Sequence, residues 1–446
     1  MPLRTANCKL QTEYMLYHIF DWLAKEGFQF PGVSLFRFIT FRVLLAMILS
    51  LVITTVYGKK LIRYLQKRQL GESVRDLGLE GEKEKKGTPT MGGIIILLAI
   101  IIPTLLLANL DKVYIRLMLL CTVWLGTIGF IDDYLKIRSK RIAQAKGVAY
   151  KKSDSDGLAG RFKIFGQVML GIIVGATLYF TPSVVVKREI VKTGDIVSQV
   201  STGTPVKYDT VIIDGKKRVF TDAKSMITTI PFVKTHEFNY AKLLPAAWQD
   251  YAYILYIFIV IIIVTAVSNG ANITDGLDGL ATGVSAIMGI CLGIFAYVSG
   301  NIKFAEYLNI MYIPNLGELS IFIAAFVGAC IGFLWYNAYP AQVFMGDTGS
   351  LALGGIIAAL AIIVRKELLI PIFCFVFLVE NLSVMIQVGY FKYTKRKYGE
   401  GRRVFLMSPL HHHYQKLGYH ESKIAVRFWI VTILSVVLAI VTLKLR

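Results

Sequence analysis

Charged residues are scarce in this sequence. Of its 446 residues, 17% are charged and 55% are hydrophobic, whereas about a quarter of a globular chain is charged. A soluble protein of this length is therefore excluded. Apolar runs recur from Phe36 to Leu443 and predict a membrane protein with one integral membrane domain over residues 1–446.

The five cysteines give neither a disulfide framework nor a metal-binding spacing. Four of them lie in apolar runs, where packing is the expected role. The first ten residues contain no apolar core that leads to a small-residue cleavage site, so no cleaved signal peptide is expected. Acidic residues are also few, 29 against 49 basic ones. In a chain this apolar, the excess of positive charge indicates loops that face anionic lipid, and no nucleic-acid partner is expected.

About ten apolar runs are long enough to cross roughly 30 Å of hydrocarbon as helices. They lie at 37–57, 91–109, 114–131, 164–181, 251–268, 281–298, 319–336, 349–364, 369–391 and 425–443. An all-α polytopic membrane fold is therefore expected. Ahead of these runs, Glu13–Leu23 mixes aromatic and polar residues, which is typical of an interfacial helix; a solvated segment is the alternative.

The basic loops predict the orientation of these helices. Loops 58–90, 132–163 and 392–424 are rich in Lys and Arg and fall on one side of the membrane in a ten-span count. The positive-inside rule makes that side cytoplasmic and places both termini on the external side.

Residues 182–250 form the one long extramembrane segment, an external insertion between spans four and five. Apolar and polar residues alternate from Val184 to Phe220, and Asp214 and Gly215 separate two such stretches. A glycine after aspartate suits a tight hairpin turn, so a small external β-hairpin is expected, with a disordered linker as the alternative.

Five polar motifs meet at the predicted cytoplasmic ends of the spans. They are Lys85–Gly93, Gly129–Lys136, Asn272–Gly283, Trp335–Gly355 and Ser408–Tyr419. Scattered anchoring charges would occur on both faces of the membrane, whereas these motifs share one face. This distribution predicts a functional site at the cytoplasmic end.

The aspartates are the first candidates for that site. Asp132 and Asp133 are expected at a helix C-terminus, where two anions are unfavourable unless a cation compensates them. Asp275 and Asp278 are three residues apart and would share a helix face, unless they form a turn between helices. Asp347 follows a glycine and precedes an apolar helix, so it is either an N-cap or a ligand for Mg²⁺, which prefers carboxylate oxygens.

Three consecutive histidines, His411 to His413, point in different directions and are poorly spaced for one zinc ion. Contact with phosphate oxygens or proton transfer fits them better. At the other motif, Lys85, Lys86 and the glycines of "GTPTMGG" would offer an anion ammonium groups and backbone amides at a helix start. Glu380 lies inside an apolar run, and there function and pairing with a neighbouring helix are equally compatible with the sequence.

Carboxylates around Mg²⁺, flanked by lysine and histidine, are the groups that phosphoryl transfer requires. A site at the membrane surface implies one water-soluble and one lipid substrate. A transporter would place its ionisable groups near the middle of the membrane.

Five motifs of this chain resemble those of the phospho-N-acetylmuramoyl-pentapeptide transferase (MraY) family, within the polyprenyl-phosphate N-acetylhexosamine-1-phosphate transferase superfamily. They are "KKGTPTMGG", "IDDYLK", "NITDGLDGLATG", "VFMGDTGSLALGG" and "PLHHHYQKLG". The resemblance covers nearly the whole membrane core. It implies ten transmembrane helices, usually a homodimer, with the site open to the cytoplasm. It also implies transfer of phospho-MurNAc-pentapeptide from its UDP carrier to undecaprenyl phosphate, which yields lipid I and UMP in peptidoglycan synthesis.

The resemblance also implies roles for single residues. Asp347 resembles the family's Mg²⁺ ligand, and His411 resembles its catalytically important histidine. Asp132 and Asp133 resemble its catalytic aspartate pair, with Asp132 as the base for the lipid phosphate. The positions that match the nucleotide pocket are Lys85, Thr90, Asn272, Asp275, Gly276, Leu277, Asp278, Asn337 and Phe344. Phe344 would stack on uracil, and substrate phosphates are expected at Lys136, Lys163, His412 and His413.

The chain departs from the usual family pattern in its longer loops 138–160 and 182–250. Two other functions remain compatible with the sequence. A sister transferase would load N-acetylglucosamine-1-phosphate for other surface polymers. A transporter or lipid flippase would move its solute without releasing UMP.

Overall fold

The computed structural model describes residues 35–36, 38–67, 87–145, 157–189, 208–213, 216–223, 226–233, 237–308 and 310–444. Within these ranges nine helices are long and apolar enough to cross a membrane, and Gly93–Leu107 is a shorter apolar helix. Together they account for the ten expected spans and confirm a multi-pass membrane protein. The interfacial helix expected at 13–23 lies outside the described residues.

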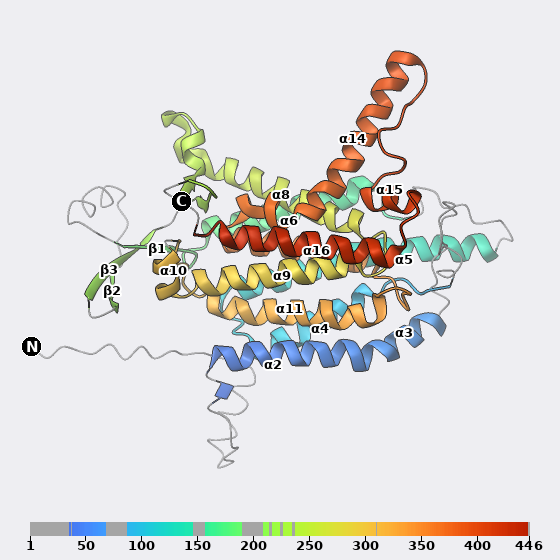
Figure 1. Ribbon diagram of the computed structural model, residues 1–446. Coiled ribbons are helices and arrows are strands. Elements are labelled where there is room, and N and C mark those ends of the chain that lie inside the picture. Colours follow the sequence, from blue (N-terminus) through green and yellow to red (C-terminus); the bar gives the residue numbers. More distant parts are fainter. Residues whose placement is uncertain are drawn as a thin grey trace, which may run out of the picture.

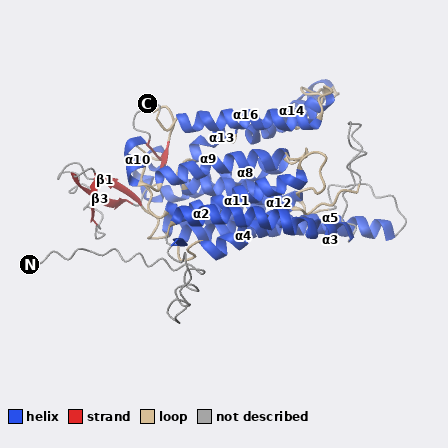
Figure 2. Cartoon of the chain, turned by 60° about the horizontal axis from the view of Figure 1, so that its bottom comes forward, coloured by secondary structure: helices blue, strands red, loops and turns tan. Residues whose placement is uncertain are grey.

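The long helices form one bundle and run side by side, except that α14 is inclined away from the others (Figures 1 and 2). In chain order they are α2 (Ile39–Val52), α3 (Gly58–Lys67), α4 (Gly93–Leu107), α5 (Val113–Ala145), α6 (Gly160–Phe180), α8 (Ala252–Thr274), α9 (Leu280–Ser299), α11 (Leu316–Asn337), α12 (Gly346–Ile363), α14 (Phe375–Tyr398) and α16 (Glu421–Val441). The π-helical turn η2 (Ile53–Tyr57) joins α2 to α3 without a break. Shorter helices lie between the long ones, namely η3 (Tyr240–Leu243), η4 (Ala246–Tyr251), α10 (Ile302–Leu308), η5 (Glu367–Leu369), α13 (Ile370–Phe373) and α15 (Leu410–Lys416).

Helix α12 forms the centre of the bundle. Every residue from Thr348 to Ile363 is buried, and the helix packs against α4, α5, α8 and α9. Its sequence is apolar all round and rich in glycine and alanine, which is the pattern of a helix that neighbours surround on every side. The polar start of α12 is therefore held in a fixed position by the helices around it.

The bundle has two distinct ends. At one end the Arg42 guanidinium of α2 donates to both carboxylate oxygens of Glu318 in α11, at 3.0 and 2.9 Å. Lys444, just after α16, donates to the carbonyl oxygen of Tyr307 in α10 at 2.7 Å. We call this the sheet end, because the β-strands lie beside it (Figure 1). We call the opposite end, where α12 starts, the site end.

Two small sheets follow α6. β1 (Val186–Glu189), β2 (Tyr208–Ile213) and β3 (Lys216–Ala223) form an antiparallel sheet in the order β1-β3-β2. Ile213 pairs with Lys216, so two residues connect β2 to β3, as predicted for a hairpin at Asp214 and Gly215. The strands confirm the hairpin, although the two turn residues lie outside the described ranges. β4 (Ile227–Thr229) and β5 (Glu237–Asn239) form a second, antiparallel pair.

The second sheet is fixed to the segment that follows α12. The amide of Thr229 donates to the Arg365 carbonyl at 3.0 Å, and the Lys366 ammonium donates to the Thr229 hydroxyl at 2.5 Å. The Tyr240 hydroxyl donates to Glu367 at 3.0 Å. Burial lowers the pKa of Lys366 to about 8 and raises the pKa of Glu367. These buried polar groups connect the insertion to the bundle core.

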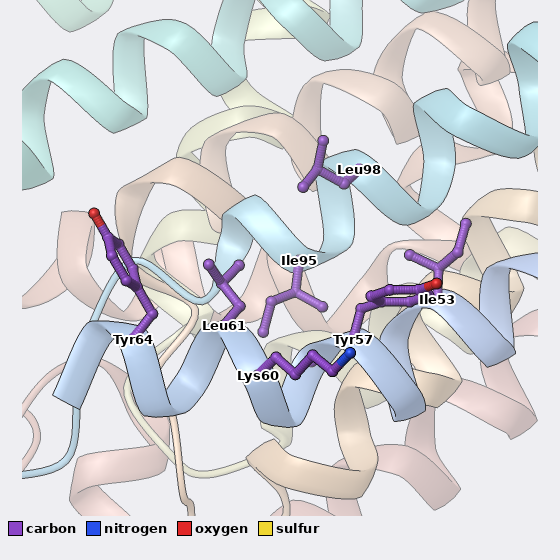
Figure 3. A pocket seen from close by; sticks show the side chains of 8 residues that line it. Ile53, Tyr57, Lys60, Leu61, Tyr64, Ile95 and Leu98 are labelled. Carbon is purple, nitrogen blue, oxygen red and sulfur yellow. The ribbon is translucent and has the colours of Figure 1, made fainter. Parts of the chain in front are cut away.

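A groove of about 320 Å³ lies between α4 and the continuous helix α2–α3 (Figure 3). It is lined by Ile53, Tyr57, Gly58, Lys60, Leu61, Tyr64, Ile95 and Leu98. Tyr57 and Tyr64 are more than half exposed, and exposed aromatic residues beside an apolar surface are typical of a membrane interface. The groove contains none of the predicted site residues, so it is distinct from the polar site.

Candidate active site

The start of α12 receives a carboxylate from a neighbouring helix. Asp133 of α5 accepts hydrogen bonds from the backbone amides of Asp347 and Thr348, at 3.1 and 2.9 Å, and from the Thr348 hydroxyl at 2.6 Å. The first amides of a helix have no partner inside the helix, and its dipole favours an anion there. Asp133 therefore fixes α5 to the N-terminus of α12.

Two lysines lie between the remaining carboxylates. The Lys136 ammonium is 2.6 Å from Asp132 Oδ2 and 3.0 Å from Asp347 Oδ2. The Lys163 ammonium is 2.9 and 2.5 Å from the same two oxygens. The Asn272 amide donates to the other oxygen of Asp347 at 2.8 Å. The structure thus brings together five predicted site residues from α5, α6, α8 and α12.

This cluster suits a divalent cation. Asp132, Asp133 and Asp347 each offer an oxygen, and these three oxygens lie within 4.8 Å of one another. Carboxylate oxygens are the ligands that Mg²⁺ prefers. The two ammonium groups already lie between Asp132 and Asp347, so positive charge at this position is what the carboxylates require. The donor set therefore fits the ion.

Close backbone contacts position the cluster. Gly346 has φ +71°, and a side chain there would lie 2.6 Å from Asp133 Oδ2. A Cβ atom on Gly129 would overlap the carbonyl group of Asp347, and one on Gly93 would overlap the backbone of Gly349. These glycines allow α4 and α5 to approach the start of α12 at backbone distance.

The Asp132–Asp133 pair does not lie at a helix C-terminus, so that expectation was wrong. Helix α5 continues to Ala145, about three turns beyond the pair. Residues 134–145 contain no glycine or proline, so nothing ends the helix where the apolar run ends. The pair is buried in mid-helix, and the contacts with α12 and the two lysines, rather than the dipole of α5, stabilise it.

The expectation that Asp275 and Asp278 share a helix face was also wrong. α8 ends at Thr274 and α9 begins at Leu280, so Asp275 to Asp278 form a turn between the two helices. The turn reading was the alternative for this glycine-rich segment, and Gly279 has a positive φ of 71° there. Asp278 accepts a hydrogen bond from the Ala341 amide at 3.0 Å.

The "GTPTMGG" segment pairs with the loop that contains Phe344. The amides of Gly92 and Gly93 donate to the carbonyls of Phe344 and Met345, both at 2.8 Å, and the Phe344 amide donates to Pro89. These two glycine amides are therefore not available to an anion, contrary to the expectation. Thr90 lies beside Gly346, while Lys85 and Lys86 lie outside the described residues.

Asn337 supports the same loop from within the core. Its side-chain oxygen accepts from the Gly279 amide and the Thr282 hydroxyl, at 3.2 and 3.0 Å, and its side-chain nitrogen donates to the Val343 carbonyl at 3.0 Å. Asn337 is 3% exposed and Leu277 is 4% exposed. Asn337 thus fixes the backbone next to the half-buried Phe344.

The three histidines have different hydrogen-bond partners, although the rings of His411 and His412 lie in contact, with centroids 4.3 Å apart. The backbone amide of His411 donates to Glu380 at 3.2 Å, and its Nδ1 lies 3.1 Å from the second oxygen of Glu380. His412 Nδ1 is 2.6 Å from the Gln415 side chain, and His413 accepts from the Leu406 amide. Glu380 is thus paired with a neighbouring segment, which was one of its two expected roles.

The remaining polar atom of His411 faces the turn between α8 and α9. Its Nε2 is buried and has no hydrogen-bond partner within the described structure. A Cβ atom on Gly276 would overlap this nitrogen. Asn272, four residues before Gly276, donates to Asp347, so residues 272–276 connect the histidine to the carboxylate cluster.

Comparison with known proteins agrees with this geometry. Residues 196–365 match the model of glycosyl transferase family 4, and residues 85–97 match phospho-N-acetylmuramoyl-pentapeptide-transferase signature 1. A phospho-N-acetylmuramoyl-pentapeptide-transferase of Flavobacterium psychrophilum is 57% identical over 437 residues, which cover 97% of this chain and all of that protein. The chain belongs to the phospho-N-acetylmuramoyl-pentapeptide-transferase family. Proteins of the same name from Flavobacterium johnsoniae and Porphyromonas gingivalis are 56% and 53% identical, again over 97% of this chain and their full lengths.

Membership of the phospho-N-acetylmuramoyl-pentapeptide-transferase family makes the chain a transferase enzyme.

One contact in the candidate site was not predicted from the sequence. Thr348 donates its hydroxyl and its amide to Asp133. A hydroxyl residue directly after an aspartate at a helix start was the available signal.

Proposed function

We propose that the chain transfers phospho-MurNAc-pentapeptide from UDP-MurNAc-pentapeptide to undecaprenyl phosphate, forming lipid I and UMP, at the carboxylate cluster at the start of α12. The observation that carries this proposal is the meeting of three carboxylates and two lysines within one polar centre. Full-length identity of 57% to a protein named for this transfer supports it.

The reaction exchanges one phosphorus–oxygen bond for another. An oxygen of undecaprenyl phosphate forms a bond to the sugar-side phosphorus of the UDP sugar. The bond from that phosphorus to the bridging oxygen breaks, and UMP leaves with this oxygen. Negative charge spreads over phosphate oxygens as the bonds exchange, and fixed positive charge stabilises it.

The residues of the cluster suit these tasks. Bound Mg²⁺, held by Asp347 with Asp132 and Asp133 beside it, would neutralise phosphate oxygens. Lys136 and Lys163 would hold further phosphate oxygens once they exchange their contacts with Asp132 for contacts with substrate. Asp132 is then freed as the base that keeps the lipid phosphate ionised.

The nucleotide would lie beside the turn between α8 and α9 and the loop that contains Phe344. Phe344 is half-buried between chain segments that Asn337 and Pro89 fix, so its ring is a rigid platform for uracil. Asp275 and Asp278 lie in this turn, and Thr90 lies in the segment that pairs with the Phe344 loop. We propose that Lys85, which lies outside the described residues, also binds the nucleotide.

We propose that the site end faces the cytoplasm of the bacterial inner membrane and that both termini lie outside. The basic loops adjoin the site end, which is the arrangement that the positive-inside rule favours. The insertion 182–250 then lies outside, away from the reaction. We also propose a homodimer, as in the family pattern, which cross-linking in the membrane would test by the appearance of a dimer band.

The deciding experiment measures UMP release by purified protein. We expect release from UDP-MurNAc-pentapeptide to require both undecaprenyl phosphate and Mg²⁺, and to stop with EDTA and resume with added Mg²⁺. Turnover of UDP-N-acetylglucosamine alone would instead support a sister transferase. Solute movement that persists in Asp347→Asn, without UMP release in the wild type, would support a transporter.

A further inference from the structure

Glu380 is a buried carboxylate for which the proposed reaction has no task. It lies within α14, is 0% exposed, and points both of its oxygens at His411. Within the described part of the chain, His411 is its one ion-pair partner. A buried carboxylate in an apolar helix destabilises the protein unless it is paired. The contact with His411 provides this pairing.

The two hydrogen bonds fix the histidine completely. One Glu380 oxygen holds the backbone of His411 through its amide, and the other holds the ring through Nδ1. Rotation of the ring would break the second bond while the first remains. The ring is therefore held in one orientation, with Nε2 directed at Gly276.

The proton count of this pair decides what Nε2 offers. A buried pair avoids net charge, because an uncompensated charge in an apolar environment is costly. Two arrangements are neutral overall: a carboxylate with an imidazolium, and a carboxylic acid with a neutral imidazole. In both, one proton lies between Glu380 and Nδ1 and a second lies on Nε2. The atom that faces Gly276 is then an N–H donor in either case.

We infer that Glu380 is a positioning residue that holds His411 with Nε2 as a hydrogen-bond donor for a phosphate oxygen of the substrate at Gly276. Two observations point there: Nε2 is a buried polar atom without a partner in the described structure, and the missing side chain of Gly276 lets this nitrogen lie against the turn between α8 and α9. The inference rests on the proposed function, since it gives the histidine a substrate phosphate as its partner. Glu380 itself touches no substrate.

The test compares the Glu380→Gln variant with the wild type. Glutamine keeps the size of the side chain and can hold the His411 backbone, but it cannot carry the charge that stabilises an imidazolium. We expect kcat for UMP release to fall about 100-fold, within the range for loss of one hydrogen-bond donor to a transition-state oxygen, while KM for the nucleotide substrate changes little. The Glu380→Asp variant, which restores the charge on a shorter side chain, should recover part of kcat.

A double-mutant cycle separates this role from a general effect on folding. If Glu380 acts through His411, adding Glu380→Gln to His411→Ala should cause no further loss of kcat. Glu367→Gln is the matched control, a buried carboxylate at the sheet end, and should keep the kcat of the wild type per folded molecule. Wild-type kcat in Glu380→Gln, or a full additional loss in the double variant, would overturn the inference. Failure of the proposed function looks different, because the wild type itself would then release no UMP.

Discussion

At the scale of single residues, Asp133 contributes more contacts to the site than its sequence position indicates. It was expected as one half of a catalytic aspartate pair, and both of its oxygens accept backbone amides of α12. Each oxygen of Asp133 therefore satisfies an amide that would otherwise be unpaired. Asp132 differs, since one of its oxygens faces only the two lysines.

The Asp133→Asn variant should therefore lose both activity and stability. Asparagine offers one acceptor oxygen where two are used, so one amide of α12 becomes an unpaired donor, at a cost of about 1–3 kcal/mol. We expect UMP release to fall at least about 100-fold and the melting temperature to drop in a fluorescence-based assay. The exposed Asp111→Asn, at the sheet end, is the control. Wild-type turnover in Asp133→Asn would remove this residue from the site.

At the scale of helices, glycine contacts decide how the site is assembled. Replacing Gly129 by alanine would drive a methyl group into the Asp347 carbonyl, and overpacking of this kind costs about 1–3 kcal/mol. We expect Gly129→Ala to lower the melting temperature and to reduce UMP release by displacing Asp347. Gly389→Ala is the matched control, because its Cβ atom has open space and alanine favours a helix. Equal effects of the two substitutions would contradict this account.

The attachment of the insertion can be tested independently of catalysis. In Tyr240→Phe, Glu367 loses a hydrogen bond, and its other oxygen already has no partner in the described structure. We expect a lower melting temperature with unchanged kcat, because the attachment lies at the far end of α12, about 27 Å along an 18-residue helix from Asp347. A large loss of kcat in the folded variant would show that the two ends are coupled.

The sequence predicted the spans well because each apolar run is as long as the membrane requires. It also predicted which aspartates meet, since alternating spans bring Asp132, Asp133 and Asp347 to one end. It did not predict the side-chain contacts between residues on different segments. The hydrogen bonds from α12 to Asp133 and the pairing of Glu380 with His411 join residues that are 214 and 31 positions apart. Local patterns indicate that Thr348 and Glu380 need partners, but not which residues those partners are. The extension of α5 was missed because the apolar run ends at the first charged residues, whereas the helix continues through them to Ala145.

At the scale of the whole molecule, the two ends of the bundle must lie on opposite sides of the membrane. The starts of α2 and α11, helix α10 and the end of α16 share the sheet end, whereas Asp132, Asp347 and His411 share the site end. Because the chain starts and ends its membrane part at the same end of the bundle, it must cross the membrane an even number of times. The described residues contain nine long apolar helices, so α4, the shorter apolar helix, must also cross. The topology of the chain therefore depends on all ten segments.

Cysteine labelling in intact cells tests that topology. The described native cysteines are buried, so a Cys8→Ser background would leave few reactive thiols. Lys303→Cys, in α10 at the sheet end, and Glu400→Cys, after α14 at the site end, are both at exposed positions. We expect a membrane-impermeant maleimide to label Lys303→Cys in intact cells, and Glu400→Cys only after the membrane is opened. Labelling of both residues from outside would place the carboxylate cluster away from the cytoplasmic supply of UDP-MurNAc-pentapeptide, and the proposed reaction could not occur there.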